Sequence, residues 1–192
     1  MSSDRLRSTT TSRTVLYEGT YLSVYKDAIR LPNGQTAVRE IVRAPSAVGI
    51  VAIDPQGQVV LVRQYREAVR QALIEIPAGI IDTRAGESPL QTAHRELAEE
   101  TGYRADRIDL LVPAYYFAEG FCDATMELYF ARDLAHVERP VEGDATELVE
   151  VVLMPFDEAY ARNLRGEFPD AKTKLGLMAA KRAMTKAVTS DQ

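Results

Sequence analysis

From residue 14 onward, the hydrophobic residues of the chain follow the pattern of extended strands. Residues 21–31 and 35–43 are rich in Val, Ile and Tyr, and they flank the sequence P-N-G. Asn-Gly between two such runs predicts a β-hairpin, because both residues tolerate a positive φ. Residues 48–53 and 58–66 flank D-P-Q-G, which is typical of a type I turn and predicts a second pair of strands.

The later part of the chain mixes helices with further strands. We expect strands over residues 72–76, 108–117, 126–131 and 148–154, and helices over residues 89–101, 156–165 and 171–186. This order predicts an α+β fold in which a mixed sheet packs between helices. We divide the chain into a Ser/Thr/Arg-rich disordered tail (1–13), an N-terminal antiparallel sheet of about three strands (14–45), a main domain (46–186) and a frayed tail (187–192).

The composition narrows the class of protein. The 192 residues include 23 Lys and Arg against 28 Asp and Glu, so the formal net charge is −5. This charge argues against a nucleic-acid-binding or membrane-surface protein, because both need clustered positive charge. The uncharged runs are shorter than the ~20 residues of a membrane span, and residues 1–13 do not resemble a secretory signal. Cys122 is the only cysteine, so we expect a cytoplasmic, reducing environment.

Residues 79–103 carry the clearest start and stop signals for a helix. Ser88 can cap the helix, Pro89 suits its first position, and Gln91 completes a capping box. Gly102 suits the left-handed conformation that follows a helix. Apolar residues three and four apart form the stripe that we expect to be buried, namely Leu90, Ala93 and Leu97.

A second stripe of this helix carries Glu96, Glu99 and Glu100, whose spacing places the carboxylates on one face. Like charges at this spacing repel, and they lie toward the helix C-terminus, where the dipole disfavours anions. A bound hard cation such as Mg²⁺ or Mn²⁺ explains them, because these ions take oxygen ligands. Arg95 can pair with Glu99 and fix its orientation. The alternative is a solvent-facing acidic surface with an incidental ion pair.

The same segment resembles the Nudix box, which runs glycine, five residues, glutamate, seven residues, and then R-E-hydrophobic-x-E-E-x-G-hydrophobic. Here Gly79 is the first glycine, Glu87 is the first glutamate, and residues 95–103 read R-E-L-A-E-E-T-G-Y. Every fixed residue type is present, but seven residues rather than five separate Gly79 from Glu87. The extra residues fall in a predicted loop, where length is tolerated.

The resemblance implies a Nudix-type α/β/α sandwich and a Mg²⁺- or Mn²⁺-dependent hydrolase of nucleoside diphosphates linked to another moiety. It implies that Glu96 and Glu100 are the main metal ligands, with the carbonyl of Ala78 completing the set. Glu99 is then a further or water-bridged ligand, and Glu99 and Arg95 belong to the catalytic residues. The chemistry is consistent, because a polyanionic pyrophosphate must be neutralised before hydroxide can approach it.

Outside the box, the sequences L-V-R-Q-Y-R (61–66) and I-E-I-P-A-G-I-I-D (74–82) resemble the ADP-ribose and nucleoside diphosphate sugar pyrophosphatase branch. By this resemblance Arg66 is the first candidate to contact a substrate phosphate, and Arg63 is the second. A guanidinium suits this role because it is always charged and donates hydrogen bonds in a fork. The alternative is that both are surface residues at the end of a strand. Glu75 either faces the site or pairs with an arginine.

A loop before the last strand of this branch supplies an acidic residue as ligand or general base. Glu147 aligns best with it, and Asp144 and Glu142 are the alternatives. The sequence D-A-K-T at 170–173 is similar to the start of the last helix in enzymes that cleave sugar nucleotides.

Two positions in the predicted substrate loop depart from the branch. Glu119 replaces a proline that usually follows the box by about 16 residues, and Ala124, beside Asp123, replaces a usual glutamate. Glu119 and Asp123 are therefore candidates to bind a ribose or hexose hydroxyl. These departures put ADP-ribose in doubt as the substrate and leave other nucleoside diphosphate sugars open.

The small N-terminal sheet has little core of its own, and in this branch it often packs in a homodimer with the substrate pocket at the junction. We therefore expect a homodimer. The predicted function is hydrolysis of ADP-ribose or a related nucleoside diphosphate sugar to a nucleoside monophosphate and a sugar phosphate. The alternatives are a hydrolase of GDP-mannose, NADH or a dinucleoside polyphosphate, a sanitising or cap-type hydrolase, and a non-catalytic nucleotide sensor.

Overall fold

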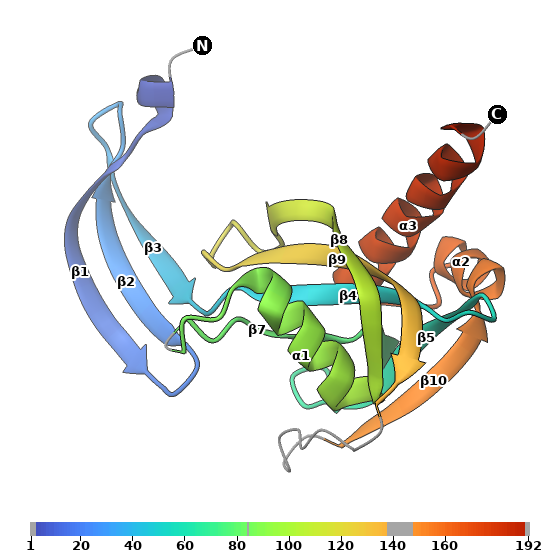
Figure 1. The fold of residues 1–192 in the computed structure, drawn as a ribbon. Helices are drawn as coiled ribbons and strands as arrows, with labels where there is room; N and C mark the ends of the chain where they lie inside the picture. Colours follow the sequence, from blue (N-terminus) through green and yellow to red (C-terminus); the bar gives the residue numbers. More distant parts are fainter. Residues whose placement is uncertain (1–2, 84, 138–147, 191–192) are drawn as a thin grey trace. The chain divides into compact units, whose positions relative to one another are not determined.

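The computed structural model describes residues 3–83, 85–137 and 148–190. These residues form two compact units, which Figure 1 traces in sequence colours. Unit 1 contains the described residues of Met1–Ser46 and of Tyr116–Thr125, and unit 2 contains those of Ala47–Tyr115 and Met126–Gln192.

Unit 1 is built on an antiparallel sheet whose strands lie in the order β1 (Thr9–Glu18), β2 (Ser23–Arg30) and β3 (Thr36–Arg43). The predicted N-terminal sheet is thereby confirmed. The hairpin between β2 and β3 is confirmed too, and its Gly34 has a φ of 86°. A short 3-10 helix precedes the sheet.

The predicted disordered tail through Arg13 is wrong for its last residues, because β1 already begins at Thr9. Thr9 lies opposite Arg30 and Arg13 lies opposite Asp27 in the ladder with β2. The Arg13 guanidinium also donates two hydrogen bonds of 2.7 Å to the carboxylate of Asp27, which is 1% exposed. The β-branched threonines of this polar stretch suit a strand once a partner strand is present.

The segment Tyr116–Thr125 belongs to unit 1, where it forms backbone hydrogen bonds with the end of β3. The Val42 backbone N–H donates to the Phe121 carbonyl at 2.7 Å, and the hydroxyls of Ser46 and Thr125 are 2.9 Å apart. The predicted substrate loop is therefore held against the N-terminal sheet.

Unit 2 contains a seven-stranded sheet. Its main path runs in the order β10-β5-β4-β9-β8, with β6 beside β5 and β7 beside β4. The strands are β4 (Ala47–Ile53), β5 (Gln58–Arg66), β6 (Gln71–Glu75), β7 (Ala78–Ile80), β8 (Tyr103–Tyr116), β9 (Thr125–His136) and β10 (Val149–Pro155). β4 pairs with β9 in parallel and with β5 and β7 in antiparallel fashion, which confirms the predicted mixed sheet.

Helices cover both faces of this sheet (Figure 1). On one face, Leu97 of α1 (Pro89–Thr101) packs in a buried cluster with Ile50 of β4. On the other face, α2 (Phe156–Leu164) and α3 (Ala171–Ser190) pack against Val51 and Leu61. The two clusters lie on opposite sides because side chains alternate along β4. The predicted α/β/α sandwich is confirmed.

The predicted start and end signals of α1 are also confirmed. The predicted burial of Leu90 and the predicted end of α3 are corrected. Ser88 caps α1 in a complete capping box, and Gly102 has the left-handed φ of 70°. Leu90, which we predicted in the buried stripe, is 41% exposed, because it is the second residue of α1 and lies at the end of the helix, whereas Ala93 and Leu97 further along are fully buried. α3 continues to Ser190, past the predicted end at Lys186. No helix in the described ranges is long and apolar enough to cross a membrane.

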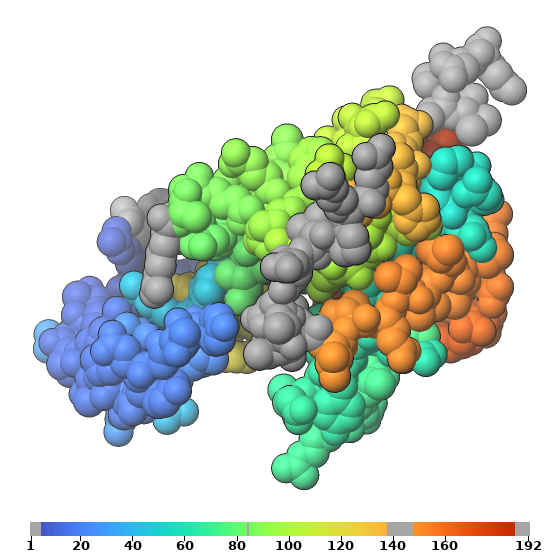
Figure 2. Space-filling view, turned by 60° about the horizontal axis from the view of Figure 1, so that its bottom comes forward, coloured from blue at the N-terminus to red at the C-terminus, as the bar shows by residue number. Residues whose placement is uncertain are grey.

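The outer edge of the sheet is open along β10, which Figure 2 shows in orange on the surface of unit 2. Val151 and Leu153 of this strand are 44% and 42% exposed. β10 pairs with β5 on its inner side through seven consecutive residues, and the other side of β5 is shared by β4 and β6. The strand that ends at Arg66 is thus held by three neighbouring strands, and Arg66 itself lies opposite Gln71 of β6.

Candidate active site

The short strand β7 lies against the acidic stripe of α1. A Cβ atom built on Gly79 would lie 1.9 Å from Cδ of Glu96, so only glycine leaves room for this carboxylate. Glu96 is 8% exposed. On the same strand, the backbone N–H of Ala78 donates a hydrogen bond of 3.0 Å to Oε2 of Glu100. Two of the three glutamates are therefore positioned by the backbone of residues 78–79.

Arg95 joins the acidic stripe to the loop before the helix. Its Nε donates to Oε1 of Glu87 at 2.9 Å, and its Nη1 lies 2.7 Å from Oε1 of Glu96 and 2.8 Å from Oε2 of Glu99. Its Nη2 donates to the carbonyl of Ile80 at 3.3 Å. The predicted pairing of Arg95 with Glu99 is confirmed, and one guanidinium orients three carboxylates.

The charges of this cluster stabilise one another. The hydrogen bond from Arg95, followed by that from Thr92, lowers the pKa of Glu87 although partial burial opposes it. The hydrogen bond to Glu87, the charge of Glu96 and the hydrogen bond to Glu99 raise the pKa of Arg95, although partial burial opposes them. At neutral pH the glutamate and the arginine are both ionised, so the guanidinium can hold the carboxylates in place.

The interpretation of the stripe as a solvent-facing acidic surface is wrong for its first member. Glu96 is buried, and the side chains of Glu96 and Glu99 are 11% and 20% exposed. Surface glutamates normally keep their carboxylates in water, because burying a charge is costly unless it is paired. The stripe therefore faces the protein, where Arg95 pairs with Glu96 and Glu99.

The donor set fits a hard divalent cation. Glu96, Glu99 and Glu100 offer carboxylate oxygens on one helix face, Ala78 offers a backbone carbonyl, and the missing side chain of Gly79 makes room for the Glu96 carboxylate. Across the described ranges, no three acidic, histidine or cysteine side chains converge as a ready-made metal cluster. In this structure Glu96 and Glu99 are turned to Arg95 instead.

Arg66 lies beside Glu75 rather than alone on the surface. Its Nη2 donates to Oε2 of Glu75 at 2.7 Å, and its Nε lies 3.1 Å from Oε1. Glu75 is 1% exposed and also pairs with Lys172 of α3. Burial alone would raise the pKa of Glu75, but the hydrogen bonds and charges of Arg66 and Lys172 lower it overall. Of the two alternatives for Glu75, pairing with an arginine is confirmed.

The other predicted site residues lie elsewhere. Arg63 pairs with Glu150 of β10 at 3.6 Å, and half of its side chain is exposed. Asp123 pairs with Arg43 at 3.4 Å within unit 1, where Glu119 is exposed. The candidates for the general base, Glu147, Asp144 and Glu142, lie outside the described residues.

Two residues near the site were not predicted to contribute to it, namely Lys172 and Thr173. Lys172 contacts Glu75, and Oγ1 of Thr173 accepts a hydrogen bond of 2.9 Å from the backbone N–H of Ile76. The signal available in the sequence was the D-A-K-T resemblance. It places both residues at the start of a helix, but it does not predict which residues they contact.

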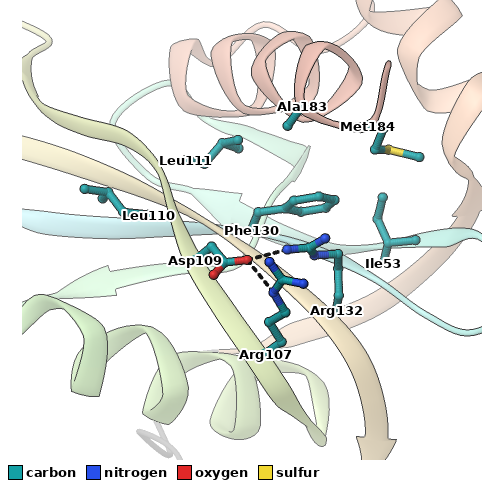
Figure 3. Close-up of a pocket in the computed structure, with 9 residues that line it drawn as sticks. All are labelled: Ile53, Arg107, Asp109, Leu110, Leu111, Phe130, Arg132, Ala183 and Met184. Carbon is teal, nitrogen blue, oxygen red and sulfur yellow. Dashed lines mark hydrogen bonds and ion pairs between the residues drawn. The ribbon is translucent and has the colours of Figure 1, made fainter. Parts of the chain in front are cut away.

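A cavity of about 520 Å³ lies on the opposite face of unit 2 from α1, between α3 and strands β4, β8 and β9 (Figure 3). Ile53, Phe130 and Met184 line it, and Arg107 and Arg132 both pair with Asp109 at one side. Of the predicted metal, catalytic and phosphate-binding residues that the structure describes, none lines this cavity.

Comparison with known proteins gives matches over nearly the whole chain. The family model "NUDIX domain" matches residues 43–175, and the model "Nucleoside diphosphate sugar hydrolase N-terminal domain" matches residues 9–42. The chain is 35% identical over 168 residues to the ADP-ribose pyrophosphatase of Bacillus subtilis (strain 168), covering 88% of this chain and 89% of the relative.

A second relative and a solved structure agree with these matches. The ADP-ribose pyrophosphatase of Mycobacterium tuberculosis (strain ATCC 25618 / H37Rv) is 37% identical over 170 residues, with coverage of 88% of this chain and 81% of the relative. The crystal structure of an ADP compounds hydrolase superposes with a TM-score of 0.84 at 25% identity, covering 97% of this chain and 98% of the other.

Proposed function

The chain belongs to the Nudix family of hydrolases, and from this premise we propose that it hydrolyses the pyrophosphate bond of ADP-ribose or of a related nucleoside diphosphate sugar. The products are a nucleoside monophosphate and a sugar phosphate. The observation that carries the proposal is the set of three carboxylates, Glu96, Glu99 and Glu100, held against β7 by Arg95 and by the Ala78 backbone. A nucleotide sensor has no need to hold mutually repelling carboxylates together.

Each residue of the site has its own role in this proposal. Glu96 and Glu100, with the Ala78 carbonyl, hold a divalent cation, and Glu99 supports them directly or through water. Arg95 keeps Glu96 and Glu99 turned toward each other, which offsets their repulsion. We propose Mg²⁺ as the ion, with Mn²⁺ as a substitute. When bound, the ion neutralises the pyrophosphate and makes water a stronger nucleophile.

Arg66 binds a phosphate of the substrate. Its guanidinium is permanently charged and forks toward oxygen pairs, as it already does toward Glu75 in this structure. Glu147 is our proposal for the base that takes a proton from the attacking water, and Glu119 and Asp123 are proposed to bind sugar hydroxyls. Arg63, which pairs with Glu150 of β10 at 3.6 Å, is proposed as a second contact to phosphate.

A panel of substrates tests the reaction and narrows the substrate. With Mg²⁺, and separately with Mn²⁺, we expect turnover of ADP-ribose or ADP-glucose to exceed that of diadenosine polyphosphates and 8-oxo-dGTP by at least about tenfold in kcat/KM, a difference of about 1.4 kcal/mol in transition-state binding. GDP-mannose and NADH complete the panel. Phosphate-product analysis should give AMP and a sugar phosphate. Hydrolysis of the dinucleotides alone, or of none of the compounds, would contradict the proposal.

We also propose a cytoplasmic homodimer in which the N-terminal sheet meets a second subunit. β1 is exposed along its whole length, and Val15, Leu16 and Tyr17 are 54%, 52% and 57% exposed. Neighbouring exposed apolar residues are typical of an interaction surface. Light scattering or analytical ultracentrifugation at micromolar concentration should give twice the chain mass, whereas monomer alone would count against the dimer.

A further inference from the structure

A chain of ion pairs connects the first turn of α3 to Arg66. Nζ of Lys172 pairs with Oε2 of Glu75 and lies 3.2 Å from Oδ1 of Asp170. Glu75 in turn accepts the fork of Arg66. The side chains of Glu75 and Lys172 are only 2% and 12% exposed, so water screens this part of the chain poorly. A change of charge at Lys172 therefore alters the electrostatic environment of Glu75 and of its second partner, Arg66.

The same turn also holds the backbone that leads to the metal site. Thr173 is fully buried, and its Oγ1 accepts the backbone N–H of Ile76. Asp170 fixes this turn, because its Oδ1 accepts the backbone N–H of Thr173 at 3.0 Å. Ile76 is followed by Pro77 and then by Ala78, whose N–H binds Glu100. Since Pro77 has no N–H to donate, Thr173 supplies a side-chain anchor just before the Ala78 contact.

We propose that the first turn of α3 is the positioning element of this active site, with Lys172 orienting Arg66 through Glu75 and Thr173 fixing the backbone before Ala78. This inference rests on the proposed function of Arg66 and Ala78 and adds to it two residues that touch neither substrate nor metal. The two branches act on different properties. Lys172 affects how well phosphate is bound, and Thr173 affects how well the cation is held.

The Lys172 branch predicts a change in KM without a matching change in kcat. In Lys172→Met, Glu75 keeps Arg66 as its one remaining ion-pair partner among the described residues, so the carboxylate draws the guanidinium toward itself and away from phosphate. We expect KM for ADP-ribose to rise about tenfold with kcat within about twofold, as for loss of ground-state binding. Lys172→Arg, which keeps the charge, should recover most of the wild-type KM.

A matched control separates this effect from a general loss of helix packing. Lys181 lies on the same helix and pairs with Asp157 of α2 at 2.6 Å, away from residues 75–78. Lys181→Met should leave KM within about twofold of wild type. An unchanged KM in a folded Lys172→Met variant would overturn the Lys172 branch, and so would an equal rise of KM in both variants.

The Thr173 branch is measured by metal binding without substrate. Thr173→Val keeps the shape of the side chain but removes the acceptor for the Ile76 N–H, and Thr173→Ser keeps the acceptor. Free Mn²⁺ followed by electron paramagnetic resonance should show about tenfold weaker binding in Thr173→Val, the size expected for residues that support metal ligands, and binding within about twofold of wild type in Thr173→Ser. Equal affinities in Thr173→Val and wild type, or equal weakening in the valine and serine variants, would overturn it.

These experiments also separate failure of the positioning role from failure of the proposed function. If the wild-type protein hydrolyses no nucleoside diphosphate sugar, the function falls, but Mn²⁺ affinity still reports on Thr173. Amide hydrogen exchange at Ile76 gives a second readout, and it should be faster in Thr173→Val than in Thr173→Ser. If the wild-type protein is active and all the variants match it in KM, Mn²⁺ affinity and exchange, only the positioning role falls.

Discussion

Replacement of Glu100 by glutamine is expected to reduce kcat for the nucleoside diphosphate sugar by about a thousandfold or more. Such a factor corresponds to about 4 kcal/mol of lost transition-state stabilisation, the scale on which a correctly held metal ion contributes. The fold should remain, because the glutamine carbonyl can still accept the hydrogen bond from Ala78, which is 3.0 Å long in this structure. The substitution removes the charge and replaces one carboxylate oxygen by an NH2 group. Initial rates with Mg²⁺ and thermal unfolding measure the two effects separately.

Glu158 provides the control for this substitution. It lies on α2 and forms an i,i+4 pair with Arg162 at 3.3 Å, so Glu158→Gln removes the same charge from another helix. We expect nearly wild-type turnover from Glu158→Gln, since exposed helix pairs contribute little. If Glu100→Gln folds, keeps its Mn²⁺ affinity and turns over substrate at the wild-type rate, Glu100 is not a metal ligand and the assignment of the carboxylates must be changed.

The sequence was sufficient to predict the part of the site that one helix builds. Ser88, Gln91 and Gly102 act on neighbours within a few residues, so the start and end of α1 follow from local chemistry. The spacing of Glu96, Glu99 and Glu100 likewise fixes a shared face whatever the helix packs against. The pairing of Arg95 with Glu99 spans a single turn, and it too was predicted.

Features that depend on a distant partner were missed. Thr9 to Arg13 have the polar composition of a tail, and only pairing with β2 makes them a strand. β7 has three residues, too few for an alternating pattern to show, although its Gly79 is in the recognised motif. Leu90 fits the apolar spacing of α1, but it lies at the end of the helix and is 41% exposed.

The pairing of Glu75 with Lys172 was missed for the same reason, because the two residues are even farther apart in the sequence. Lys172 is 97 residues away from Glu75, and no pattern in either segment reveals the pair. The sequence left two alternatives for Glu75, facing the site or pairing with an arginine, and it did not name Lys172 as a partner. The fold brings α3 to the end of β6 and so gives a buried carboxylate two cations, which burial requires. A side chain that looks incidental in the sequence thereby becomes part of the support of the site.

Replacement of Gly79 by alanine is expected to lower kcat/KM by about a hundredfold while leaving the protein folded. The new methyl group would lie 1.9 Å from both Cδ and Oε1 of Glu96, so the carboxylate has to move. A misplacement of about 1 Å in a catalytic constellation typically costs about a hundredfold. The backbone needs no special conformation at this position, since Gly79 is not among the glycines with positive φ. The displaced atoms are the end of a flexible side chain, so thermal unfolding should change little.

A double-mutant cycle shows whether Gly79→Ala acts through Glu96. Glu96→Gln alone should also lower activity strongly, because a neutral amide is a poorer ligand for Mg²⁺ than a carboxylate. If the methyl group acts only by displacing that carboxylate, adding Gly79→Ala to Glu96→Gln should cost less than about threefold, since one interaction cannot be lost twice. Fully multiplicative losses would instead mean that the methyl group disturbs something else, such as the Ala78 backbone beside it. In that case the close approach of β7 to α1 would serve the Ala78 and Glu100 contact rather than Glu96.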